Sequence, residues 1–523
     1  MTMNSLQRLR YVRPKKELAY VLLSRSKHTH PSFSSSDSEI TTTTNPKPND
    51  NLSPKEQKLM RHFKKCSTMK DINQIHADIV KSGFECSLYL IGKIIVFCAV
   101  SERGDIGYGV SVFQRMENPD GFSWNTMIRG FIKANEPQMA FDYYKRMQEK
   151  GEVADNFTFS FLLKGCSQLD LAELGRQMHC STIKLGLESH VFVRNTLIHM
   201  YGNMKLIGYA RQLFDEMPSP QLVAWNTIID CHVCCGNCKE ALDLFSLMRG
   251  SCIEPDDATF VATLSACSAL GALDYGRRIN SCINRSRFHS VVQVKNSLID
   301  MYVKCGAVEE AFEVFNQMCN KNTVTWNTMI HGLATHGHTN EALLLFSRML
   351  EEKFVTPDVA TFLGVLCACS HGGLVEEGKK YFHIMITDHG IKPTIKHYGS
   401  MVDILGRAGF VDEAYQLIRR MPTDSNAVVW RTLLAACRLH GNVEIGELAS
   451  RHLLELVPDH SSDYVLLSNI YASEGQWNQV LSVRRSMHYR SVQKPQAGNS
   501  FIGLHPNAES EMDVTETSYE TKN

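Results

Sequence analysis

The stretch Trp124-Asn125-Thr126-Met127-Ile128 returns twice further along the chain. The copies are Trp225-Asn226-Thr227-Ile228-Ile229 and Trp326-Asn327-Thr328-Met329-Ile330, each 101 residues after the one before it. A fourth, altered copy follows 104 residues later as Trp430-Arg431-Thr432-Leu433-Leu434. Self-similarity at a fixed spacing is the signature of a repeat architecture, so one kind of structural unit recurs along most of this chain.

The 101-residue period divides into units of 35, 35 and 31 residues, because two further landmarks recur inside it. One landmark is a segment from Phe to Cys at 159–166, 260–267 and 362–369, and the other is the segment at 195–198 and 296–299. Each unit is predicted to form two helices. In the first helix, Met127, Ile128 and Phe131 fall on one stripe at helical spacing, and a Gly or Asn near Asn135 ends it.

The second helix of each unit carries a small residue at the twentieth position, which lets the two helices approach closely; examples are Ala140, Ala241 and Ala342. One helical pair cannot bury its own apolar face, so neighbouring pairs must stack into a continuous core. The sequence therefore predicts an all-α solenoid.

Composition excludes several other classes of protein. The 523 residues are 43% hydrophobic with a mean hydropathy of −0.19, and apolar stretches such as 89–100 are shorter than a membrane span of about 18 residues requires. Formal net charge is zero, so any nucleic-acid binding must come from local contacts rather than from a polycationic field. The 17 cysteines are expected to be reduced, buried thiols and not a disulfide framework.

These motifs resemble the plant pentatricopeptide repeat family, in the subgroup whose motifs alternate between P, L and S types. A uniform 34-residue tetratricopeptide array, which binds peptides, fits less well because the units alternate in length. Degenerate motifs are placed at 56–87 and 88–120, and clear ones at 121–155, 156–190, 191–221, 222–256, 257–291, 292–322, 323–358, 359–394 and 395–426. Residues 430–440 and 464–487 resemble the subgroup's two extension motifs.

The resemblance implies a right-handed α-solenoid superhelix of stacked helix-turn-helix pentatricopeptide repeats. The expected organisation is an organelle transit peptide with linker at 1–50, degenerate repeats at 56–120, a P-L-S array at 121–426, extension motifs at 427–494 and a disordered polar tail at 495–523. The transit peptide is expected because the first 36 residues carry seven basic residues against the single acid Glu17, followed by many Ser and Thr. We expect a mitochondrial location, with the chloroplast as the alternative.

In this family the fifth and last residues of a motif select one RNA base, and the second residue helps to sandwich it. The resemblance assigns uracil to three pairs: Asn125 with Asp155, Asn226 with Asp256, and Asn327 with Asp358. It assigns a pyrimidine to Asn296 with Asn322, and leaves the base of Asn195 with Gln221 open. The flanking apolar contacts would be Phe122, Val223 and Val324.

The chemistry of these pairs is reasonable, because an Asn amide offers a donor and an acceptor to a pyrimidine edge and an adjacent carboxylate can fix its orientation. The structural alternative is that each Asn caps or stitches adjacent helices. Ser160, Val261 and Leu363 stand at the fifth position of the L motifs and Gly399 at that of the last S motif, so these motifs are expected to be spacers. Some members of this family specify a cytidine for editing. Counting nucleotides upstream of such a cytidine, with one base per motif, predicts uracils at about −6, −9 and −12 and a pyrimidine at about −7.

No catalytic, metal or cofactor site is expected. Relatives with a cytidine deaminase carry H-x-E and P-C-x-x-C segments, but none of the 21 histidines here is followed by Glu two positions later. The sequence stops shortly after 498–502, where a deaminase would be expected to begin. Four cysteines at 231, 234, 235 and 238 could in principle hold zinc, but they align with the end of a first helix and its turn.

The resulting hypothesis is a site-recognition factor for cytidine-to-uridine editing of organelle transcripts. The protein would bind single-stranded organelle RNA and recruit a deaminase-bearing pentatricopeptide protein and accessory editing factors in trans, with no membrane or small-molecule substrate. One alternative is a splicing, processing or stability factor that acts by occupying RNA. The other is a protein-binding helical scaffold.

Overall fold

The computed structural model describes residues 53–352, 354–422, 425–490 and 492. Within those ranges every element is an α-helix and no strand occurs. The all-α repeat fold predicted from the sequence is therefore confirmed. The segments 1–50 and 495–523, for which a transit peptide and a polar tail are predicted, lie outside the described residues.

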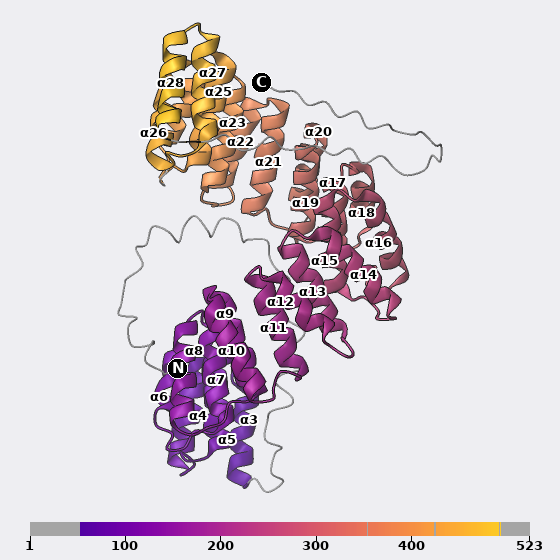
Figure 1. The fold of residues 1–523 in the computed structure, drawn as a ribbon, viewed down its shortest axis with the longest axis vertical. Helices are drawn as coiled ribbons and strands as arrows, with labels where there is room; N and C mark the ends of the chain where they lie inside the picture. The colour runs from indigo at the N-terminus through magenta and orange to yellow at the C-terminus, as the bar shows by residue number, and fades with distance from the viewer. Residues whose placement is uncertain (1–52, 353, 423–424, 491, 493–523) are drawn as a thin grey trace, which may run out of the picture. The chain divides into compact units, whose positions relative to one another are not determined.

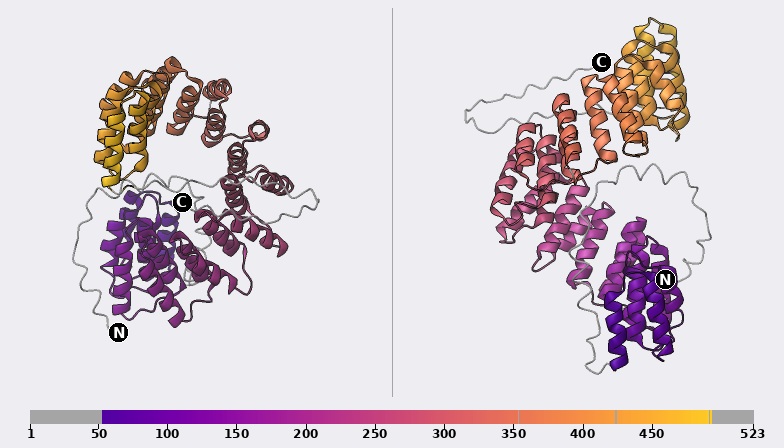
Figure 2. Two further views of the ribbon diagram at one scale, coloured as in Figure 1. Left: turned by 45° about the horizontal axis from the view of Figure 1, so that its top comes forward. Right: turned by 180° about the vertical axis from the view of Figure 1, so that it is seen from behind.

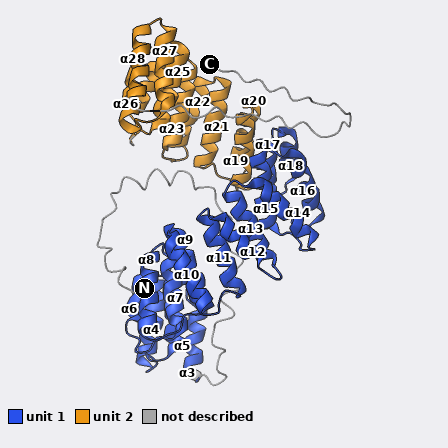
Figure 3. Cartoon of the chain, viewed as in Figure 1, with its two compact units in different colours: residues 1–321 blue, residues 322–523 orange. Residues whose placement is uncertain are grey.

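The chain forms two compact units, residues 1–321 and 322–523 (Figure 3). The helices of the first unit are α3 Pro54–Lys65, α4 Met69–Lys81, α5 Leu88–Val100, α6 Ile106–Phe113, α7 Gly121–Lys133, α8 Pro137–Glu149, α9 Asn156–Leu169, α10 Ala172–Lys184, α11 Val191–Asn203, α12 Ile207–Asp215, α13 Leu222–Cys234, α14 Cys238–Gly250, α15 Asp257–Leu270, α16 Leu273–Arg285, α17 Val292–Lys304 and α18 Val308–Gln317. Those of the second are α19 Thr323–Thr335, α20 Thr339–Glu351, α21 Val359–Gly372, α22 Val375–Thr387, α23 Ile395–Arg407, α24 Val411–Arg419, α25 Ala427–His440, α26 Val443–Leu456, α27 Ser461–Ser473 and α28 Trp477–Tyr489 (Figure 1).

Odd-numbered helices from α7 to α23 begin at the first residue of the motifs placed by sequence, and the next even-numbered helix completes each pair. The turn between the two helices needs a left-handed residue, since φ is +60° at Asn135, +81° at Gly236 and +81° at Gly337. Gly and Asn tolerate that conformation better than other residues. The predicted break near Asn135 is therefore a tight turn with a defined backbone requirement.

Within each unit, the first helix of a motif packs on its own second helix and on the first helix of the next motif. In the first unit the first helices contact one another in the order α5, α7, α9, α11, α13, α15 and α17, and in the second unit in the order α19, α21, α23, α25 and α27. Figure 2 shows these rows of hairpins from two further sides. The repeated tryptophan belongs to the core, since the rings of Trp124 and Phe113 pack edge to face at 4.7 Å, as do those of Trp225 and Phe214.

Two glycines at the twentieth position have their nearest neighbour in the next motif and not, as predicted, in the partner helix of the pair. A Cβ added to Gly276 of α16 would lie 2.4 Å from Sδ of Met301, which belongs to α17 of the next motif. Likewise, a Cβ on Gly175 of α10 would lie 2.8 Å from Sδ of Met200 in α11. At these two glycines, the space is therefore needed for the next motif rather than for the partner helix within the pair.

Two first helices approach closely at Gly130 of α7, where an added Cβ would lie 2.6 Å from Cβ and 3.2 Å from Cα of Ala99. Because the neighbour is backbone and not a flexible side-chain end, Gly130→Ala is expected to lower the free energy of unfolding by about 1–3 kcal/mol. Urea unfolding of the full chain measures this. Gly121→Ala in the same helix is the control, because an added Cβ meets nothing within 4 Å there and should leave stability unchanged or slightly higher. Equal stability of the two variants would contradict the packing argument.

Across the described ranges, no helix is long and apolar enough to cross a membrane. All 17 cysteines lie in those ranges as free thiols. The expectation that they are buried holds for some, such as Cys166 and Cys267, but is wrong for others, such as Cys86 and Cys252, which are exposed. Of the exposed ones, Cys86 and Cys252 lie in turns, whereas Cys180 lies on the outer face of α10.

Candidate nucleic-acid interface

Each of the three Asn–Asp pairs predicted from the sequence is brought into direct contact. The amide Nδ2 donates to the carboxylate Oδ1 at 3.0 Å from Asn125 to Asp155, at 2.9 Å from Asn226 to Asp256 and at 2.9 Å from Asn327 to Asp358. The Asn comes from the first helix of a P motif, and the Asp precedes the first helix of the following L motif. The carboxylate thus fixes the amide across the boundary between two motifs.

The Asp side chains are placed by helix capping. Asp155, Asp256 and Asp358 are the N-cap residues of α9, α15 and α21, and each accepts a hydrogen bond from the backbone N–H three residues later. An N-cap carboxylate satisfies an N–H group that has no partner inside the helix. The N-cap that starts each of these L motifs therefore also holds the carboxylate against the asparagine of the preceding P motif.

A threonine that the sequence analysis missed completes each group. The hydroxyl Oγ1 of Thr158 donates to Oδ1 of Asn125 at 2.6 Å, and Thr259 and Thr361 do the same to Asn226 and Asn327 at 2.6 Å each. We call these groups the Asn–Asp–Thr networks. Thr158 and Thr259 are also 101 residues apart, so the period that revealed the asparagines could have revealed the threonines.

The networks stitch adjacent helices, as the structural alternative proposed, but they do not use up the amide. A carboxamide has two N–H donors and can accept two hydrogen bonds at its oxygen. One donor goes to the carboxylate and one oxygen position takes the threonine hydroxyl, so one donor and one acceptor position remain. Stitching and base contact are therefore compatible at the same residue.

The predicted sandwiching residues lie one helical turn before the asparagines and differ in exposure. Val223 is 43% exposed and Val324 56% exposed, which places apolar surface beside the partly exposed Asn226 and Asn327. Phe122 is half-buried, and its ring lies 3.6 Å from where a Cβ on Gly92 would be. An exposed apolar side chain beside a polar amide offers an unpaired base both a contact surface and a hydrogen-bonding group.

The S-motif pairs are arranged differently. Asn195 is half-buried, and its Oδ1 is buried without a hydrogen-bond partner among the described residues. Gln221 is exposed and its side chain does not cap α13, although it stands at the N-cap position. Asn296 lies in the first unit and Asn322 in the second, where Asn322 accepts from the backbone N–H of Thr325 at 3.0 Å and caps α19.

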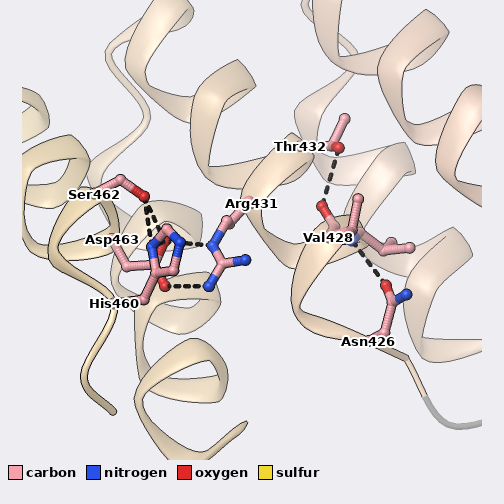
Figure 4. A network of polar contacts seen from close by, with 8 residues as sticks. Asn426, Val428, Arg431, Thr432, His460, Ser462 and Asp463 are labelled. Carbon is pink, nitrogen blue, oxygen red and sulfur yellow. Dashed lines mark hydrogen bonds and ion pairs between the residues drawn. The ribbon is translucent and has the colours of Figure 1, made fainter. Parts of the chain in front are cut away.

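In the altered fourth copy, all three members of the network have changed together. Arg431 of α25 takes the place of the asparagine, His460 stands at the N-cap of α27 in place of the aspartate, and Asp463 stands where the threonine would be. The guanidinium forms a two-point ion pair with the carboxylate, Nε to Oδ1 at 2.7 Å and Nη2 to Oδ2 at 3.0 Å (Figure 4). Asp463 is 1% exposed and the arginine side chain 24% exposed. An ion pair therefore fills the position of the amide at this junction.

Family models match the same segments. A model of the PPR repeat family matches residues 119–168, 220–269 and 321–371, a PPR repeat model matches 192–219, 294–323 and 396–425, and an E motif model matches 440–502. Pentatricopeptide repeat-containing protein At1g31920 of Arabidopsis thaliana is 36% identical over 468 residues, 88% of this chain and 76% of the relative. The chain belongs to the pentatricopeptide repeat family. Another Arabidopsis thaliana relative, pentatricopeptide repeat-containing protein At1g59720, chloroplastic/mitochondrial, is 39% identical over 455 residues, 84% of this chain and 71% of the relative.

Solved structures of this family share the fold. The structure of maize PPR10 in complex with an 18-nt psaJ RNA element has a TM-score of 0.64 to this pentatricopeptide repeat chain at 16% sequence identity, covering 81% of this chain and 65% of PPR10. At that identity the likeness concerns the arrangement of helices. It agrees with the row of helical pairs seen within each unit.

The L motifs of this pentatricopeptide repeat protein have no amide to offer at the fifth position. The Ser160 hydroxyl donates to the carbonyl of Asn156 within its own helix at 2.7 Å. Val261 and Leu363 are partly buried apolar side chains. Asparagine amides at the fifth position are thus found in the three P motifs and in the S motifs at 191–221 and 292–322, and L motifs lie between them.

The cysteine-rich segment 231–238 spans the end of α13, a turn and the start of α14, as its alignment with the other repeats predicts. The thiol of Cys231 faces the carbonyl of Ile198 at 3.6 Å and that of Cys235 faces the carbonyl of Gly202 at 3.5 Å. Burial raises the pKa of the Cys231 thiol well above its usual range, which opposes the thiolate that a metal needs. In the part of the chain that the structure describes, no group of three or more His, Cys, Asp or Glu side chains could hold a metal ion.

Proposed function

We propose that this protein binds one stretch of single-stranded RNA through its P and S motifs. The observation that carries the proposal is the Asn–Asp–Thr network, which recurs at three P motifs and leaves a donor and an acceptor position of each amide available. The likeness to PPR10, whose structure holds an RNA element, supports the same conclusion. A net charge of zero requires base contacts to supply much of the affinity.

Within this function we propose site recognition for cytidine-to-uridine editing. The support is the match to the E motif over residues 440–502, together with the P-L-S order of the motifs. The repeats would select the site, and the extension motifs would recruit a deaminase-bearing pentatricopeptide protein and accessory editing factors in trans. The Arg431–Asp463 ion pair supports this division, because that junction has no amide for a base.

An organelle is the proposed location. Relatives whose names carry chloroplastic, or chloroplastic/mitochondrial, support it. The basic, hydroxyl-rich sequence before residue 50 supports it independently. We propose the mitochondrion first and the chloroplast as the alternative.

Loss of this protein is expected to leave one cytidine of an organelle transcript unedited, because each site-recognition factor selects a site through its own set of bases. Sequencing organelle transcripts from a loss-of-function plant measures this. Affinity purification of the intact protein should recover a deaminase-bearing relative and organelle RNA. Normal editing together with a splicing or stability defect would favour the RNA-occupancy alternative, and purification without RNA would favour the protein scaffold.

A further inference from the structure

The aspartate carboxylate and the threonine hydroxyl together determine which way the asparagine amide faces. The amide oxygen and nitrogen are nearly equal in size, so an Asn side chain can turn over unless its neighbours distinguish the two atoms. At Asn226, Nδ2 lies 2.9 Å from Oδ1 of Asp256, and Oδ1 lies 2.6 Å from Oγ1 of Thr259. If the amide turned over, its oxygen would face the carboxylate oxygen with no hydrogen between them, which is repulsive.

Thr259 is itself held so that its hydrogen points to the amide. Its oxygen accepts the backbone N–H of Asp256 at 3.1 Å, and the threonine is fully buried. The Thr259 hydroxyl has one hydrogen and lies within hydrogen-bond distance of two acceptors, Oδ1 of Asn226 at 2.6 Å and Oδ1 of Asp256 at 2.8 Å. The carboxylate Oδ1 also accepts from Nδ2 of Asn226 and from the backbone N–H of Thr259, so we assign the hydroxyl hydrogen to the shorter contact, the one with Asn226.

The orientation of the amide decides between the two pyrimidines. Uracil has a carbonyl oxygen where cytosine has an amino group, so the two bases exchange an acceptor for a donor at that position. An amide that can turn over presents its N–H to one base and its carbonyl to the other. A fixed amide can present only one of them, and in the networks the remaining N–H of Nδ2 is a donor.

The junction after Asn195 is a natural comparison within the same chain. Gln221 stands where the aspartate would be and Ala224 where the threonine would be. Neither side chain bonds to the amide, and Oδ1 of Asn195 is buried without a partner among the described residues. Nothing described distinguishes the two ends of this amide.

We propose that the third residue of the following motif is a specificity-determining position in this protein: Thr158, Thr259 and Thr361 lock the amide to favour uracil over cytosine, and Ala224 leaves Asn195 able to accept either. The inference rests on the proposed RNA binding. It adds a third residue type to each base-contacting group, and it predicts that asparagines at equivalent positions of one chain differ in selectivity.

Thr259→Val tests the lock, because valine keeps the buried shape and removes the hydroxyl. Binding is measured for two RNAs that differ only in having U or C at the nucleotide facing Asn226. The ratio of the two dissociation constants is expected to fall roughly three- to tenfold, as expected for one hydrogen bond. Thr259→Ser keeps the hydroxyl and should retain the ratio.

Thr263→Val is the matched control, since Thr263 is equally buried in the same helix but donates to the carbonyl of Thr259 at 2.8 Å. A purely structural effect lowers affinity for both RNAs and leaves their ratio unchanged. The double variant Gln221→Asp with Ala224→Thr is the converse test. It should create a preference for U at the nucleotide facing Asn195, where the wild type is expected to bind U and C equally. At the third P motif, Asn322 and Thr325 occupy the positions equivalent to Gln221 and Ala224. A threonine therefore fits at this position of a P motif.

The outcomes separate the two proposals. If the protein binds RNA but Thr259→Val keeps the full preference for U, the lock is wrong while RNA binding stands. A wild type that binds RNA without distinguishing U from C opposite Asn226 also overturns the lock alone. Failure of the wild type to bind any RNA overturns the proposed function and the lock together.

Discussion

An RNA with three uracils spaced three nucleotides apart is expected to bind at least roughly 100-fold more tightly than the same RNA with purines at those positions. The spacing follows from the motif order, because two motifs separate each P motif from the next and each motif faces one base. A wrong base costs about 1–3 kcal/mol, and separated positions add. Three such losses of at least ~1 kcal/mol each raise the dissociation constant by about two orders of magnitude.

Changing the RNA is the cleaner test, because the asparagines also hold the fold. Replacing Asn125, which is buried and bonded to both Asp155 and Thr158, would disturb the contact between α7 and α9 as well as the base. Altering the RNA leaves the protein unchanged. The measurement is a gel shift or fluorescence titration of the full chain.

The matched control changes other nucleotides of the same RNA. Purines placed opposite the L motifs should have little effect, because Val261 and Leu363 present no hydrogen-bonding group. Equal affinity for the uracil-patterned RNA and its purine variant would contradict base reading by the networks. Equal loss at L-motif and P-motif positions would mean that the RNA is held without regard to sequence.

Much of the fold could be predicted because its determinants are local and repeated. The tryptophan of each P motif, the left-handed turn at Asn135 and the N-cap at Asp155 each act within about one motif. The pairing of Asn125 with Asp155 could also be predicted, since family resemblance placed both at fixed positions. The neighbour of Gly276 could not, because periodicity gives the position of a small residue but not the helix that it meets.

The threonines and the ion pair were missed for a different reason. Thr158 recurs with the same period as Asn125, but a threonine near a helix start is explained by capping alone, so the pattern gave no reason to connect it with the asparagine. Arg431 was recognised as a change, yet its partner Asp463 lies 32 residues away. Only the structure shows that His460 and Asp463 changed at the equivalent positions of one junction.

Arg431→Met is expected to destabilise the extension motifs by about 3–5 kcal/mol, because it removes the guanidinium from the buried carboxylate of Asp463 and leaves only the longer contact with His460, at 3.6 Å. Repeats unfold locally, so the loss should appear as faster hydrogen exchange of the α25 and α27 amides and not along the whole chain. Arg407→Met is the matched control. Its ion pair with Asp403 lies on the surface of the same unit, with the arginine side chain 56% exposed, and its removal should cost less than about 1 kcal/mol.

A rescue separates the charge from the shape of the site. Replacing Arg431, His460 and Asp463 by Asn, Asp and Thr removes the buried charge at position 463 and installs the network seen at the three P motifs, so most of the lost stability should return. Arg431→Asn alone should remain unstable, because Asp463 keeps its charge and loses the two-point contact. If Arg431→Met exchanges no faster than Arg407→Met, the ion pair does not hold α25 to α27. The packing of Leu433, Leu434 and Ile470 in the shared core would then have to account for the stability of this junction.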